Sequence, residues 1–149
     1  MAANWNGGSA ATYGTLIGPA QVTAWVIEMS TKGRRHPLWT LTAAFGLVTL
    51  GLSFLAAGLP GVGSWLMLYG AGNGIYSLAR GTVPLALFGA DRYASLIGRL
   101  ARPGLVAQAL APPIGAFVLA HGSADALLWV LVALAATNLG LVRALWRLR

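Results

Sequence analysis

The chain has 149 residues, of which 57% are hydrophobic, 9% are charged and none is cysteine, and its formal net charge is +7. Soluble domains carry about 25% charged residues, so ten basic and three acidic side chains are too few to cover a soluble surface, and the lack of cysteine excludes disulfides and thiolate metal sites. The basic residues lie in short gaps between apolar runs rather than on one polar face, so we expect no nucleic-acid binding.

Five apolar runs follow one another, each long enough to cross a hydrocarbon core of about 30 Å as a helix. After a polar N-terminal loop at residues 1–10, the runs cover residues 11–29, 38–59, 64–90, 103–120 and 126–142. Pro84 permits a kink in the third run, and Pro112-Pro113 must bend or break the fourth. The sequence therefore predicts an all-α membrane helix bundle of five transmembrane helices over residues 11–149.

The basic residues alternate between the gaps and predict an orientation. The gap after the first run, the gap after the third run and the C-terminal tail each contain three lysines or arginines, whereas residues 60–63 and 121–125 contain none. Basic loops stay on the cytoplasmic side of a membrane. We therefore expect an integral protein of the cytoplasmic (inner) membrane, with the N-terminus outside and the C-terminus inside.

Several short motifs resemble the C-terminal half of major facilitator superfamily transporters. They are Lys32-Gly33-Arg34-Arg35, residues 68–75 (LYGAGNGI), residues 79–85 (ARGTVPL) and residues 108–112 (QALAP). Gly33, Arg34 and Arg35 match the inner-loop motif of the family, while Ser30 and Thr31 stand where that motif has an acidic and a basic residue. The resemblance covers nearly the whole chain and aligns its five runs with helices eight to twelve of the family's twelve.

This resemblance implies the C-terminal portion of a secondary transporter that moves a small solute by alternating access. The substrate path of such transporters lies between two helix bundles, so we expect a fragment or one half of a split protein that needs the missing N-terminal helices or another membrane protein. The alternative is a non-transporting membrane remnant or accessory protein that associates with other membrane helices.

Arg80 and Glu28 are the two charged residues inside the apolar runs. Arg80 lies roughly 24 Å along its helix from the outer side, a depth at which an ionised residue is a functional candidate. Alternatively, its long side chain reaches the inner headgroups. Glu28 reaches a similar depth and could pair with Arg80, or it could lie at the inner interface beside Lys32, four residues later.

Four amides lie in the middle of the predicted spans: Gln21, Asn73, Gln108 and Asn138. A buried amide needs hydrogen-bond partners, so we expect these side chains and Arg80 to line a substrate path. Hydrogen bonds between helices are the other way to satisfy them.

Two Gly-x-x-x-Gly pairs, Gly14 with Gly18 and Gly70 with Gly74, predict close helix packing. No catalytic site is expected, because His36 and His121 fall in opposite loops and no nucleophile has both a base and an orienting acid. We also expect no metal site and no cofactor, so the chain is not predicted to be an enzyme.

Overall fold

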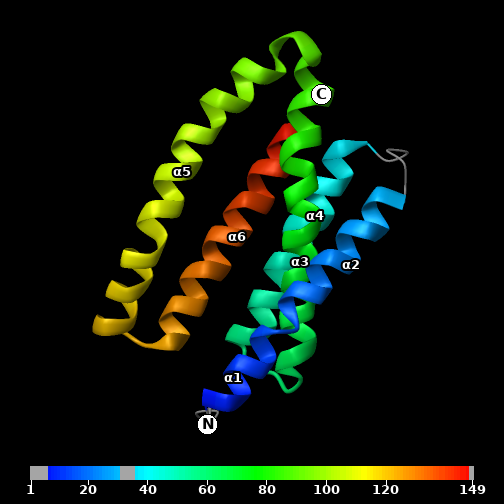
Figure 1. Cartoon of the computed structure of the whole chain (residues 1–149). Coiled ribbons are helices and arrows are strands. Elements are labelled where there is room, and N and C mark those ends of the chain that lie inside the picture. Colours follow the sequence, from blue (N-terminus) through cyan, green and yellow to red (C-terminus); the bar gives the residue numbers. More distant parts are fainter. Residues whose placement is uncertain (1–6, 31–35, 148–149) are drawn as a thin grey trace.

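The computed structural model describes residues 7–30 and 36–147, and within these ranges every regular element is an α-helix. The helices are α1 (Gly7–Gly14), α2 (Ile17–Ser30), α3 (Pro37–Ala56), α4 (Val62–Phe88), α5 (Ala90–His121) and α6 (Ala124–Arg147). Helices α2 to α6 run in alternating directions, and α1 continues the line of α2 (Figure 1). The start of α1 and the end of α6 therefore lie at opposite ends of the bundle.

Helix α4 lies at the centre of the bundle because α2 and α3 pack against different faces of it (Figure 1). A Cβ atom on Gly70 would lie 2.8 Å from the carbonyl oxygen of Ile17 in α2, and one on Gly72 would lie 2.7 Å from that of Ala44 in α3. Residues two apart on a helix point in nearly opposite directions. Alternating glycines therefore let two neighbouring backbones approach α4 at once.

The second predicted packing pair, Gly14 and Gly18, makes no such contact. A Cβ atom on either residue would meet nothing within 4 Å, because α1 ends at Gly14 and the chain bends before α2 begins at Ile17. Pro19 lies in the first turn of α2, where its missing N–H interrupts a helix that would otherwise continue from α1. The predicted first span, residues 11–29, is therefore a broken helix, and it starts earlier than predicted because residues 7–10 belong to α1.

The predicted basic loop between the third and fourth spans is also helical. Only Gly89, with φ of +74°, separates α4 from α5, and residues 90–102 form the first part of α5. Tyr93, Leu96, Ile97 and Leu100 have the i, i+3, i+4, i+7 spacing of one helix face, which allows the charged residues of this segment to lie on the other. The structure also shows no break at Pro112-Pro113, because α5 continues to His121.

Helices α5 and α6 form the outer part of the bundle (Figure 1). Helix α6 packs on α3, where the Trp146 indole N–H donates to the Thr42 hydroxyl at 3.1 Å and the ring meets Trp39 edge-on. Helix α5 has smaller contacts with α4 and α6, and none of its residues is buried. It is therefore the least tightly held of the long helices.

The surface is apolar and the interior is rich in small residues, the reverse of a soluble bundle. Leu105, Phe117 and Leu134 are each about 60% exposed, whereas Ala44 and Ala79 are fully buried. Three helices, α3, α5 and α6, are long and apolar enough to cross a membrane. Helix α2 has only 14 residues, and the centre of α4 contains glycines and polar side chains. Of the predicted five-span bundle, the structure therefore shows an all-helical chain with three candidate membrane spans.

Candidate functional site

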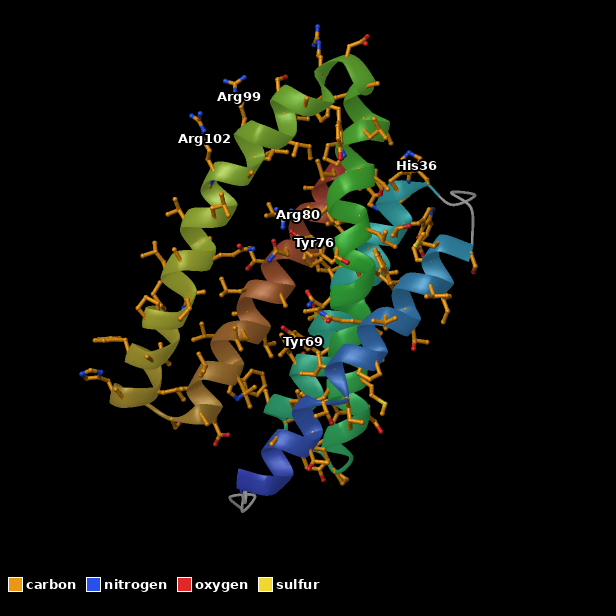
Figure 2. The ribbon with its side chains drawn as sticks, in the orientation of Figure 1. His36, Tyr69, Tyr76, Arg80, Arg99 and Arg102 are labelled. Carbon is orange, nitrogen blue, oxygen red and sulfur yellow. The ribbon has the colours of Figure 1, made fainter. Side chains whose placement is uncertain are left out.

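One face of α4 carries a line of polar side chains. Asn73, Tyr76, Ser77 and Arg80 follow the i, i+3, i+4, i+7 spacing that places residues on one side of a helix. The glycines that contact α2 and α3 occupy other faces, so this polar face remains open toward α5. Figure 2 shows Arg80 and Tyr76 on this inner side of α4, whereas Arg99 and Arg102 of α5 point away from the bundle.

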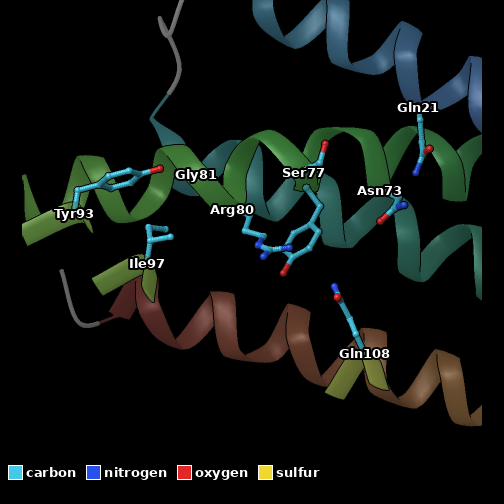
Figure 3. Close-up of a pocket in the computed structure, with 9 residues that line it drawn as sticks. Gln21, Asn73, Ser77, Arg80, Gly81, Tyr93, Ile97 and Gln108 are labelled. Atoms are coloured by element: carbon cyan, nitrogen blue, oxygen red, sulfur yellow. The ribbon is translucent and has the colours of Figure 1, made fainter. Parts of the chain in front are cut away.

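A cavity of about 430 Å³ lies along this face, between α2, α4 and α5. Helix α2 contributes Gln21, and α5 contributes Tyr93, Ile97 and Gln108. The side chains of Asn73, Arg80 and Gln108 extend into the space between the helices (Figure 3). Four of the five predicted substrate-path residues, separated by up to 87 positions in the sequence from Gln21 to Gln108, therefore line one cavity.

A second cavity, of about 460 Å³, adjoins the first on the α5 side. The two cavities share Tyr76, Arg80, Ile97 and Gln108. The second is otherwise lined by Leu100, Ala101 and Gly104, so it adds an apolar wall. Together they form one groove between α4 and α5, polar along α4 and mainly apolar along α5.

Arg80 is the only lysine, arginine, aspartate or glutamate among the nine residues that line the first cavity. Among the described residues no hydrogen bond or ion pair engages its side chain. The remaining polar groups are the amides of Gln21, Asn73 and Gln108 and the hydroxyls of Tyr76, Ser77 and Tyr93. A positive charge surrounded by neutral donors and acceptors can bind a polar or anionic solute.

The structure does not bring Glu28 and Arg80 together. The Glu28 carboxylate accepts a 2.6 Å hydrogen bond from the hydroxyl of Thr40, a buried residue of α3. Arg80 instead faces the cavity on the α5 side of α4. Glu28 therefore links α2 to α3, and Arg80 keeps its charge available within the cavity.

Asn138 lies apart from the other amides. It is exposed on α6, and its side-chain amide donates to the carbonyl oxygen of Leu134 in the same helix at 3.0 Å. The amide is therefore satisfied locally and lines none of the cavities described above. The inner-loop residues Gly33, Arg34 and Arg35 lie outside the described residues.

The two predicted packing glycines of α4 face α2. A Cβ atom on Gly74 would collide with the backbone of Gln21, just as one on Gly70 would collide with Ile17. The Gly74 contact fixes the backbone at the residue whose side chain reaches the cavity. Close packing of α2 on α4 thus positions Gln21 beside Asn73.

Sequence reasoning missed the hydroxyl-bearing residues Tyr76, Ser77 and Tyr93. The spacing of Tyr76 and Ser77 relative to Asn73 and Arg80 was sufficient to place them on the same helix face. Tyr93 was missed for another reason, because its segment was predicted as a loop. No group of three or more histidine, aspartate or glutamate residues able to hold a metal ion occurs in the described part of the chain.

Comparison with protein-family models, with curated proteins and with solved structures gave no match to this chain.

Proposed function

We propose that the chain is the C-terminal portion of a secondary transporter in the cytoplasmic membrane, where it moves a small solute by alternating access as a fragment or one half of a split protein. The observation that carries this proposal is the convergence of Gln21, Asn73, Arg80 and Gln108 on one cavity between three helices. Polar residues within apolar helices are costly unless they face a partner or a water-filled path, and the cavity that these four residues line supports the second of these roles.

The arrangement of the helices supports five crossings. Helices α1 and α2 together form a first, broken crossing, and discontinuous helices are common beside transporter binding sites. Helix α4 is shielded from lipid by α2 and α3 on two sides and directs its polar face toward the cavity. Its modest apolar content is therefore compatible with a central position in a membrane bundle.

The proposed partner is the set of helices that would form the opposite wall of the path. Helices α2, α4 and α5 supply one wall, and alternating access requires two units that move relative to each other. On this view the chain alone forms a binding surface but no closed pathway. The major facilitator resemblance of residues 68–75, 79–85 and 108–112 is consistent with seven preceding helices in the complete transporter.

The exposed surface of α5 favours a second candidate, a non-transporting accessory protein. None of its residues is buried, and Leu105, Val106 and Ile114 are each more than half exposed. Such a surface could pack on helices of another membrane protein without any solute moving. Transport measurements separate the two functions.

The first experiment compares solute flux by the chain alone and by the chain reconstituted with a separately expressed segment that supplies the other helices. We expect saturable counterflow of labelled solutes only from the combined sample, because one wall cannot close a path on both sides. The matched variants are Gln108→Leu, which removes an amide from the cavity, and Asn138→Leu, which removes an amide from the outside of α6. Gln108→Leu should lower flux at least about tenfold, and Asn138→Leu should leave it unchanged.

Saturable flux by the chain alone as a monomer would contradict the split-transporter proposal. Equal losses in Gln108→Leu and Asn138→Leu would remove the cavity from the pathway. Stable association with the segment that supplies the other helices but no flux of any solute would favour the accessory function.

A further inference from the structure

We propose that the cavity binds a small organic anion, whose charged oxygens meet Arg80 and whose apolar part packs against Tyr76, Tyr93 and Ile97. The inference rests on the proposed function because it names the class of solute that the same site would accept. It depends on three features of the cavity: its charge, its hydrogen-bonding groups and its size.

The charge of the cavity is positive and has no counterion among the lining residues. Arg80 is the only basic residue there, and all three acidic residues of the chain lie elsewhere. Glu28 is bound by Thr40, while Asp91 and Asp125 lie in the first turns of α5 and α6. A charge in an environment less polar than water attracts an opposite charge more strongly than it would in water. An anion is therefore the ligand that this cavity stabilises most.

The hydrogen-bonding groups suit a carboxylate or phosphate bound at one end of the ligand. The guanidinium of Arg80 presents several N–H donors in a planar fork that matches two anionic oxygens. Asn73 lies seven residues before Arg80 on the same face of α4, and Gln108 faces both from α5. Their amides can donate to the same anionic group or to its polar substituents.

The size of the cavity and its apolar wall indicate an organic body rather than a bare inorganic ion. Binding sites for small organic ligands occupy about 300–1,000 Å³, and the first cavity measures about 430 Å³. Tyr76, Tyr93 and Ile97 offer apolar surface beside Arg80, and the adjoining cavity adds Leu100 and Ala101. A compact anion such as chloride would leave most of this surface without a contact.

The phosphate of a lipid headgroup could bind an arginine in the same way as the anionic group of a small solute. The distance of Arg80 from the end of its helix bears on which of the two it would meet. Arg80 precedes the end of α4 by eight residues, or about 12 Å of helix. Arg99 and Arg102, on the first part of α5, lie nearer than Arg80 to the end of the bundle at which α4 joins α5 (Figure 2). These outer arginines, rather than Arg80, are the expected lipid-phosphate ligands.

The test measures thermal unfolding of the full chain in a neutral detergent with sodium benzoate, sodium acetate or inorganic phosphate, each at an ionic strength matched with sodium chloride. Benzyl alcohol serves as an uncharged probe that carries the same phenyl ring as benzoate. We expect Tm to rise with the concentration of benzoate, to rise less with acetate or phosphate, and not to rise with benzyl alcohol. A ligand that binds only the folded state raises its stability in proportion to the logarithm of ligand concentration.

Three variants assign the effect to Arg80. Arg80→Gln should abolish the benzoate response, and Arg80→Lys should weaken apparent affinity about tenfold because lysine lacks the planar fork. Arg99→Gln is the matched control, since it removes the same charge from an exposed arginine that, unlike the exposed Arg80, lines neither cavity. If Arg80→Gln fails to fold, the comparison of Arg80→Lys with the wild type and Arg99→Gln decides the matter.

The proposal is overturned if none of the three anions raises Tm above the value in matched chloride, if Arg80→Lys responds like the wild type, or if Arg99→Gln weakens the response as much as Arg80→Lys does. It is also overturned if an Arg80-dependent rise in Tm appears only when phosphatidylglycerol replaces phosphatidylcholine in nanodiscs, because the anion is then a lipid. Binding and transport are measured separately. Arg80-dependent benzoate binding without flux in the combined sample would contradict the transport function but not the anion site. Flux that depends neither on anions nor on Arg80 would contradict the anion site but not the transport function.

Discussion

Glycine residues determine how closely the central helices approach. Gly70 and Gly74 lie against the α2 backbone, and Gly72 and Gly51 occupy the contact between α3 and α4. At these positions even a methyl group would meet backbone atoms, which cannot rotate away as a side-chain tip can. The small side chain is therefore required by the neighbouring helix rather than by the conformation of α4 itself.

Gly74→Ala tests this packing directly. The added methyl group would collide with the Gln21 backbone, so α2 must move. We expect a loss of about 1–3 kcal/mol in the free energy of unfolding, the usual cost of overpacking. Thermal or denaturant unfolding in detergent provides the measurement.

Gly140→Ala is the matched control, because a Cβ atom at Gly140 in α6 meets nothing within 4 Å. Alanine is the better helix former, so this variant should gain up to about 1 kcal/mol. If the two glycines give the same change, helix propensity and not packing explains the effect of Gly74→Ala.

At the scale of the helices, prolines lie one helical turn after two of the residues that line the cavity. Pro84 follows Arg80 by four residues, and Pro112 follows Gln108 by four residues. A proline cannot donate to the carbonyl group four residues earlier, so the backbone at both cavity residues lacks its usual intrahelical donor. In α5 the next residue, Pro113, extends this effect to Ala109. The helix remains continuous but is locally weakened beside the cavity.

The double variant Pro112→Ala with Pro113→Ala should stiffen α5. The two restored N–H groups can donate to the carbonyl groups of Gln108 and Ala109. We expect amide hydrogen exchange in residues 109–116 to slow on the order of tenfold, since local opening then breaks more hydrogen bonds. Ile114→Ala changes an exposed side chain in the same segment without altering backbone donors, and should leave exchange unchanged. Unaltered exchange in the double variant would show that these prolines do not weaken the helix.

At the scale of the whole molecule, the basic residues gather toward one end. Arg92, Arg99 and Arg102 belong to the first part of α5, and Arg143 and Arg147 belong to the last part of α6. Alternating helix directions bring these two segments to the same end of the bundle (Figure 1). The turns at residues 57–61 and 122–123 lie at the other end and contain no lysine or arginine. This separation of charge supports the proposed orientation with the C-terminus inside.

Single cysteines test the orientation without background, because the chain has none of its own. Leu59→Cys and Ser123→Cys should react with a membrane-impermeant maleimide added outside intact cells, whereas Ser95→Cys and Ala144→Cys should react only after permeabilisation. These sites are exposed and avoid Gly61, whose φ of +95° makes substitution costly, and Gly122, where a Cβ atom would lie 2.9 Å from the Val118 carbonyl oxygen. The opposite labelling pattern would reverse the proposed topology.

The sequence alone indicated an all-helical, apolar chain and the approximate positions of its long helices, because composition and run length are local properties. It also identified Gln21, Asn73, Arg80 and Gln108 as polar residues in apolar surroundings. It misassigned residues 91–102, whose charged side chains suggested a loop, because only helix periodicity distinguishes an exposed helix face from a polar connection.

Only the tertiary structure decided which of these residues meet. Helix packing places Gln21 and Gln108 in the same cavity as Asn73 and leaves Asn138 outside it. The same packing lets Glu28 accept a hydrogen bond from Thr40 rather than pair with Arg80. The same holds for the glycines, since Gly70-x-x-x-Gly74 faces a neighbouring backbone and Gly14-x-x-x-Gly18 does not. Residue spacing predicts which side chains share a helix face. Which helix packs against that face depends on contacts between segments far apart in the chain.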